Sequence, residues 1–133
     1  MLNSTKSESI TQGIKIEVTH EFVPEQSDAE ENKYTFAYQI TITNTGDRWA
    51  KLTARHWIII DSDGNREDVQ GTGVVGYTHE LSPGESFEYT SFCTINTNWG
   101  TMEGTFEMMR DDDSTFDAVI KRFFLVYPDL VNA

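Results

Sequence analysis

Three glycines in the stretch QGTGVVG follow the spacing of a phosphate-binding loop. Gly71, Gly73 and Gly76 occupy the G-x-G-x-x-G positions with which dinucleotide-binding folds hold a pyrophosphate. In those folds a helix follows the glycines and directs its free N–H groups at the charge. Here Pro83 and Gly84 would end such a helix before its third turn. The sequence therefore does not predict a parallel βαβ nucleotide fold.

Two interpretations of the glycine segment remain. The backbone amides of residues 71–76 form an anion-binding concavity if successive residues alternate between right-handed and left-handed conformations. Alternatively, the glycines serve backbone geometry by allowing a positive φ or a bulge where the strand crosses between sheets. Glu67 and Asp68 precede the segment and would repel a phosphate, and no lysine follows in the P-loop position. We favour the second interpretation.

The stretch Asp61-Ser62-Asp63-Gly64-Asn65 resembles the start of a calcium loop but lacks the third acid and the bidentate glutamate of that motif. A hairpin turn explains it better. Asp61 and Asp63 are nevertheless the metal ligands that the sequence offers, for a weakly bound divalent cation.

Histidine, cysteine and serine residues do not form a recognisable catalytic or zinc pattern. His20, His56 and His79 are not spaced i, i+2 or i+4 from one another or from a cysteine, so a zinc site would need tertiary assembly. Cys93 is the only cysteine and lies on the apolar side of its strand, which predicts a buried, inert thiol and no intrachain disulfide. Ser91 has no G-x-S-x-G context. We expect neither an enzyme nor a bound cofactor.

Size and charge exclude further classes of function. The 133 residues predict one domain, and the net charge of −12, from ten basic and 22 acidic residues, disfavours nucleic acid as a partner. Several acids gather in segments that otherwise look like turns: Glu25, Asp28, Glu30 and Glu31; Asp61, Asp63, Glu67 and Asp68; and Asp111, Asp112 and Asp113. The chain has no apolar run near the roughly 20 residues of a membrane span and no leader pattern. We expect a cytoplasmic protein that does not insert into membranes.

Alternating polar and apolar residues predict strands along most of the chain. The clearest runs are 14–22, 34–43, 49–61, 87–95, 102–108 and 115–128. Turn residues separate them every ten to fifteen residues and no segment has a helical period, so we predict an all-β fold of about seven strands, an immunoglobulin-like antiparallel β-sandwich. Trp57 would occupy the core. Residues 1–12 look like a polar, flexible terminus before a single domain, 13–133.

The order of several motifs is similar to that of a known family. An R-x-W strand at Arg55 to Trp57, a D-x-x-G turn, the stretch VQGTGVVG, a P-G pair, Y-x-S and then GTMEGTFEMM resemble the ApaG family, as do YTFAYQITITN and FFLVYP. The resemblance implies an immunoglobulin- or fibronectin-III-like sandwich. It also implies a bacterial association with cobalt and magnesium resistance or efflux. In eukaryotes the domain is joined to F-box proteins and to a DNA-polymerase-interacting protein, which implies a module that binds proteins.

Two functional hypotheses follow. The first is a non-catalytic cytoplasmic binding module that contacts a protein through aromatic residues outside the core, such as Trp49 or Trp99. The alternative is a small-ligand sensor, in which the amides of residues 71–76 bind a phosphate or nucleotide and Asp61 and Asp63 hold a divalent cation. An enzyme such as a pyrophosphate hydrolase ranks third.

Overall fold

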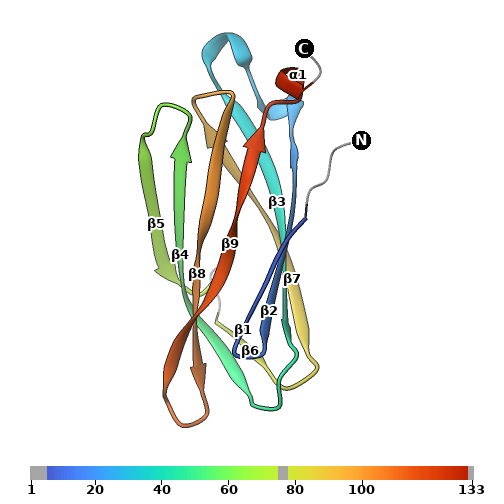
Figure 1. Ribbon diagram of the computed structural model, residues 1–133, viewed down its shortest axis with the longest axis vertical. Helices are drawn as coiled ribbons and strands as arrows, with labels where there is room; N and C mark the ends of the chain where they lie inside the picture. Colours follow the sequence, from blue (N-terminus) through green and yellow to red (C-terminus); the bar gives the residue numbers. More distant parts are fainter. Residues whose placement is uncertain (1–5, 75–77, 132–133) are drawn as a thin grey trace.

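The structure, a computed structural model, describes residues 6–74 and 78–131. Within these ranges the chain forms two antiparallel sheets packed face to face (Figure 1). The first sheet contains, in spatial order, β1 (Lys6–Thr11), β2 (Ile14–Phe22), β3 (Tyr34–Asn44) and β7 (Ser86–Ile95). The second contains β5 (Arg66–Thr72), β4 (Ala50–Asp61), β8 (Trp99–Arg110) and β9 (Thr115–Val126), with the short β6 (His79–Leu81) also paired to β4. The predicted antiparallel β-sandwich is confirmed.

Helical structure in the described ranges is limited to three short turns. These are η1 (Pro24–Gln26), η2 (Ala29–Glu31) and α1 (Pro128–Val131). None of the described helices has the length and apolar character needed to cross a membrane.

The core is formed by the inward side of each alternating strand. The buried side chains of β3 include Phe36, Tyr38, Ile40 and Ile42, and none of these four is more than 7% exposed. Trp57 of β4 is 3% exposed and meets the Tyr38 ring edge-on, with 5.3 Å between ring centroids. Its predicted core position is confirmed. Alternation with period two builds this core because successive side chains of a strand point to opposite faces.

Part of the N-terminal segment expected to be flexible, residues 6–11, forms a strand, whereas residues 1–5 lie outside the described part of the chain. Residues 6–11 form β1 and pair with β2 across a two-residue turn in which Gln12 and Gly13 both have positive φ, as a type I′ hairpin requires. On its other side β1 meets β9: Ser7 Oγ donates to the Lys121 carbonyl at 2.9 Å, and the Val119 amide donates to Thr11 Oγ1 at 3.1 Å. Polar side chains thus satisfy backbone groups at the edge of the opposite sheet.

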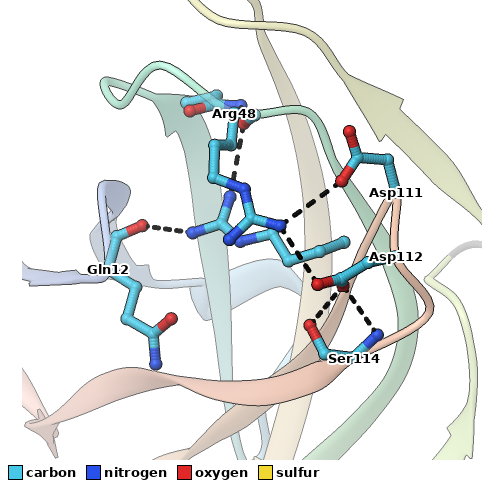
Figure 2. Close-up of polar contacts among 7 residues, drawn as sticks. Gln12, Arg48, Asp111, Asp112 and Ser114 are labelled. Carbon is cyan, nitrogen blue, oxygen red and sulfur yellow. Dashed lines mark hydrogen bonds and ion pairs between the residues drawn. The ribbon is translucent and has the colours of Figure 1, made fainter.

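The acidic turn between β8 and β9 is ion-paired. Arg48 places Nη2 3.3 Å from Asp111 Oδ1 and 3.5 Å from Asp112 Oδ2, as Figure 2 shows. Asp112 Oδ1 also accepts hydrogen bonds from the amide and hydroxyl of Ser114. The predicted location of this acidic run in a turn is confirmed.

Glu67 and Asp68 are placed differently from the prediction of a turn. Both lie within strand β5, because the turn residues end at Asn65 and the backbone pairs with β4 from Arg66 onward.

Candidate functional site: a cleft beside the glycine segment

The two sheets are joined on one side and separated on the other. Contacts between β1 and β9 close the first side. On the opposite side the edge strands β5 and β7 leave a cleft of about 440 Å³ between the sheets. Its apolar lining includes Trp57, Ile59, Val69 and Met102. This volume lies within the range of small-molecule sites.

Arg55 places a positive charge in this cleft. On β4 this residue, Trp57 and Ile59 occupy alternate positions, so it lies on the same inward face, and it is half-buried. Its Nη1 donates hydrogen bonds to the carbonyl of Gly73 at 2.9 Å and to that of Thr72 at 3.3 Å. Within residues 6–74 and 78–131, no carboxylate lies within ion-pair distance of its guanidinium. Among the described residues, the hydrogen-bond partners of this charged group are carbonyl oxygens.

The glycine segment packs against this arginine. A Cβ atom at Gly71 would lie 2.8 Å from Nη1 of Arg55, so a side chain at this position would displace the guanidinium from the place it occupies. Gly73 has φ +63° and its amide donates to the Thr53 carbonyl at 2.8 Å. The positive φ of Gly73 agrees with the expected backbone role, Gly71 instead leaves space for a side chain, and Gly76 lies outside the described residues.

Tyrosine hydroxyls line the cleft from the other sheet. The buried Oη of Tyr89 has no hydrogen-bond partner among the described residues. Burial raises the pKa of Tyr89 and of Tyr38, an effect that the nearby charge of Arg55 offsets only in part. Both phenols are therefore protonated donors at neutral pH.

Cys93 lies deeper in the same cleft and is 8% exposed. Burial, with a smaller contribution from the charge of Glu67, raises the pKa of the thiol to about 12. The prediction that this cysteine is buried is confirmed. A thiol with this pKa is a poor nucleophile, since the thiolate is the reactive form.

Asp61 and Asp63 lie at the far end of the same hairpin. Asp61 Oδ1 accepts from the amides of Asp63 and Asn65, at 2.9 and 3.0 Å, and closes the turn between β4 and β5. This confirms the hairpin turn. Residues 66–70 of β5 separate this turn from Gly71, a distance of about 20 Å along an extended strand. The structure does not bring the predicted metal ligands to the predicted phosphate site.

Each of the three histidines contacts a different residue. His56 Nε2 is 2.7 Å from Asp68 Oδ2, His79 stacks on Phe87 at 4.0 Å, and His20 stacks on Phe123 at 5.2 Å. Across the described part of the chain, no three His, Cys, Asp or Glu side chains are grouped so that they could hold a metal ion.

Comparisons with known proteins agree with the architecture. The model of the ApaG domain matches residues 24–110. The chain belongs to the ApaG family. It is 48% identical over 126 residues to Protein ApaG of Anaeromyxobacter dehalogenans (strain 2CP-C), covering 95% of this chain and 99% of that one. Protein ApaG of Aromatoleum aromaticum is 45% identical over the same length, covering 95% and 99%.

Solved structures of similar proteins have the same fold. The putative ApaA protein of Bordetella pertussis has a TM-score of 0.84 at 44% identity, over 86% of this chain and 94% of that one. An X-ray structure from the Northeast Structural Genomics Consortium has a TM-score of 0.83 at 41% identity, over 92% of each chain.

In this ApaG chain, sequence reasoning missed Arg55, Tyr38 and Tyr89 as site residues. The sequence does carry one signal for Arg55. This charged residue precedes the core residue Trp57 by two positions, so it lies on the inward face of the strand. No spacing could reveal Tyr89, because it comes from β7 in the other sheet.

A second feature of the ApaG sandwich lies on the outer face of its five-stranded sheet. Trp99 of β8 and Phe124 of β9 stack with 6.5 Å between ring centroids and are 39% and 53% exposed. Trp49, the other tryptophan expected outside the core, is half-buried.

Proposed function

We propose that the protein is a non-catalytic protein-interaction module whose contact surface is the outer face of the five-stranded sheet around Trp99 and Phe124. The observation that carries the proposal is the stacked, exposed pair itself. Large aromatic side chains are enriched among the residues that contribute most to binding at protein interfaces. The core of the sandwich is formed by other residues, so packing does not explain why Trp99 and Phe124 are present, and their exposure suits a binding role.

The surroundings of the pair suit such an interface. Arg122 of β9 and Glu103 of β8 form an ion pair with 2.5 Å between Nε and Oε2, and both side chains are partly exposed. Protein interfaces commonly combine an apolar centre with a charged, solvated rim. The aromatic pair and the ion pair together provide both parts.

The absence of catalysis is part of the proposal. It is supported by the ionisation of the groups in the cleft, since the Cys93 thiol and the Tyr38 and Tyr89 phenols stay protonated at neutral pH. None of them is available as an anionic nucleophile or base.

We further propose that any association with cobalt or magnesium resistance is indirect, through a cytoplasmic protein partner. The sensor alternative needs a cation beside a bound phosphate. Asp61 already accepts hydrogen bonds within its own turn, and residues 66–70 of β5 separate this turn from Gly71. These contacts favour the interaction module over the sensor.

Site-specific photo-crosslinking in cells tests the proposal. A benzophenone amino acid at Phe124 should form a discrete adduct with one protein, and the same group at Thr90, exposed on β7, should not. Trp99→Ala should reduce the adduct at position 124 strongly. Equal adducts at both positions, or none, would count against this surface. Saturable amide shifts at Gly71, Gly73 and Asp61 with magnesium and ATP would favour the sensor.

A further inference from the structure

We propose that the cleft between β5 and β7 binds a small monocarboxylate with an apolar body, whose carboxylate lies against the Arg55 guanidinium and the Tyr89 hydroxyl. This site lies between the sheets and is separate from the outer face that carries Trp99 and Phe124. It stands or falls independently of the protein-interaction surface.

The first reason is the unbalanced charge of Arg55. Placing an ionised side chain in a half-buried site is costly unless an opposite charge accompanies it. The protein carries 22 acidic residues, yet none of those in the described ranges pairs with Arg55. Among the described residues, only Nη1 of its guanidinium donates hydrogen bonds. Its remaining N–H groups form the planar fork that binds a carboxylate.

The second reason is that the buried hydroxyl of Tyr89 has no hydrogen-bond partner among the described residues. A buried donor without a partner costs free energy, so most such groups in native proteins are paired. Arg55, Tyr38 and Tyr89 all line the cleft, and the charge of Arg55 partly offsets the effect of burial on the pKa of both phenols. A carboxylate between them would accept from the guanidinium and from the Tyr89 phenol together.

The third reason is that the glycine segment keeps Arg55 in position. Gly71 provides the space that the guanidinium fills, and the carbonyl of Gly73 anchors Nη1 at 2.9 Å. The R-x-W strand and the segment that contains Gly71 and Gly73 thus together hold the guanidinium of Arg55 at the cleft. The anion-binding group beside the glycines is a side chain and not their amides.

The lining of the cleft defines the rest of the ligand. Trp57, Ile59, Val69 and Met102 present apolar surface, which suits a hydrocarbon or aromatic body. Glu67 also lines the cleft, and the whole chain carries a charge of −12, so a dianion or trianion is repelled more strongly than a monoanion. A monocarboxylate therefore fits better than a phosphate or a nucleotide.

The test is an amide and arginine-side-chain chemical-shift titration of the full chain with phenylacetate, hexanoate, acetate and inorganic phosphate. We expect saturable shifts at Arg55 Nε–H and at Gly71 with phenylacetate or hexanoate, and weaker binding of acetate and phosphate. Arg55→Gln should weaken binding about 10- to 100-fold, as loss of a charged hydrogen bond implies. Arg66→Gln, which removes the same charge from the exposed side of β5, should leave affinity unchanged.

Tyr89→Phe provides a second variant in case Arg55→Gln does not fold. It removes only the hydroxyl and should weaken phenylacetate binding about 5- to 10-fold. No saturable shift with any acid would overturn the proposal, as would saturation by phosphate at lower concentrations than by the acids. Equal loss of binding in Arg66→Gln would show a general charge effect and would also overturn it.

Discussion

The Arg110 guanidinium donates a hydrogen bond to the Gln12 backbone carbonyl, 2.7 Å from its Nη2, and so ties the end of β8 to the turn between β1 and β2. Arg110 is only 6% exposed. Its Nη1 is 3.3 Å from the Arg48 carbonyl, and its Cζ lies 4.6 Å from the centroid of the Phe116 ring. Carbonyl oxygens and an aromatic face thus hold this buried cation and join three chain segments.

Replacing Arg110 with methionine should lower the free energy of unfolding by about 2–3 kcal/mol, because two carbonyls lose a charged donor and the cation–π contact is lost. Arg48→Met is the matched control. Its ion pairs with Asp111 and Asp112 are exposed and should contribute no more than about 1 kcal/mol. Urea unfolding at constant m value measures both. Similar losses in the two variants would contradict a structural role specific to Arg110.

Gly104 should be intolerant of any side chain. A Cβ atom there would lie 2.0 Å from the backbone oxygen of His56, at the point where the register of β8 shifts against β9. Gly104→Ala should therefore separate β8 from β4 locally and lower the free energy of unfolding by about 3 kcal/mol or more. At Gly46 the nearest atom would be 3.5 Å away, so Gly46→Ala should cost less than about 1 kcal/mol. Equal stabilities of the two variants would refute the steric argument.

Cys93 should react with thiol reagents only when the protein unfolds. A pKa raised by burial from 9.0 to about 12 lowers the thiolate fraction at pH 8 by about a thousandfold, and the side chain is 8% exposed. The control is Cys93→Ala combined with Thr90→Cys, which places the one thiol on the exposed side of the same strand. Rapid modification of native wild-type protein, at the rate of this control, would show that the thiol is accessible.

Sequence patterns predicted the strands whose burial alternates along the chain. The strand predictions for residues 14–22 and 34–43 are confirmed, because each strand buries one face and this alternation is visible within the segment itself. Residues 6–11 were missed because their strand has little apolar character: Ser7 and Thr11 satisfy the edge of β9, more than a hundred residues away. Local periodicity carries no information about such a partner.

The candidate site was only partly predictable for the same reason. The spacing of Gly71 and Gly73 indicates a segment that borders the cleft. The space that Gly71 leaves for the guanidinium, however, depends on its pairing with Arg55 between β4 and β5. Tyr89 reaches the cleft from the other sheet. The chemistry of the site therefore follows from strand register and sheet packing, which local motifs and periodicity do not reveal.

Mild acid should destabilise the protein through His20. Burial lowers the pKa of this side chain, which stacks on Phe123, below its ordinary value of 6.5. The unfolded chain then binds more protons than the folded chain once the pH falls through about 6.5, so the free energy of unfolding should be constant above about pH 7 and decline below it. His20→Gln should flatten this decline, and His56→Gln should retain it. Urea unfolding between about pH 7.5 and 5.5 avoids the range in which most carboxylates titrate. A stability that rises on acidification, or a His20 ring that titrates above 6.5, would reverse the sign of the argument.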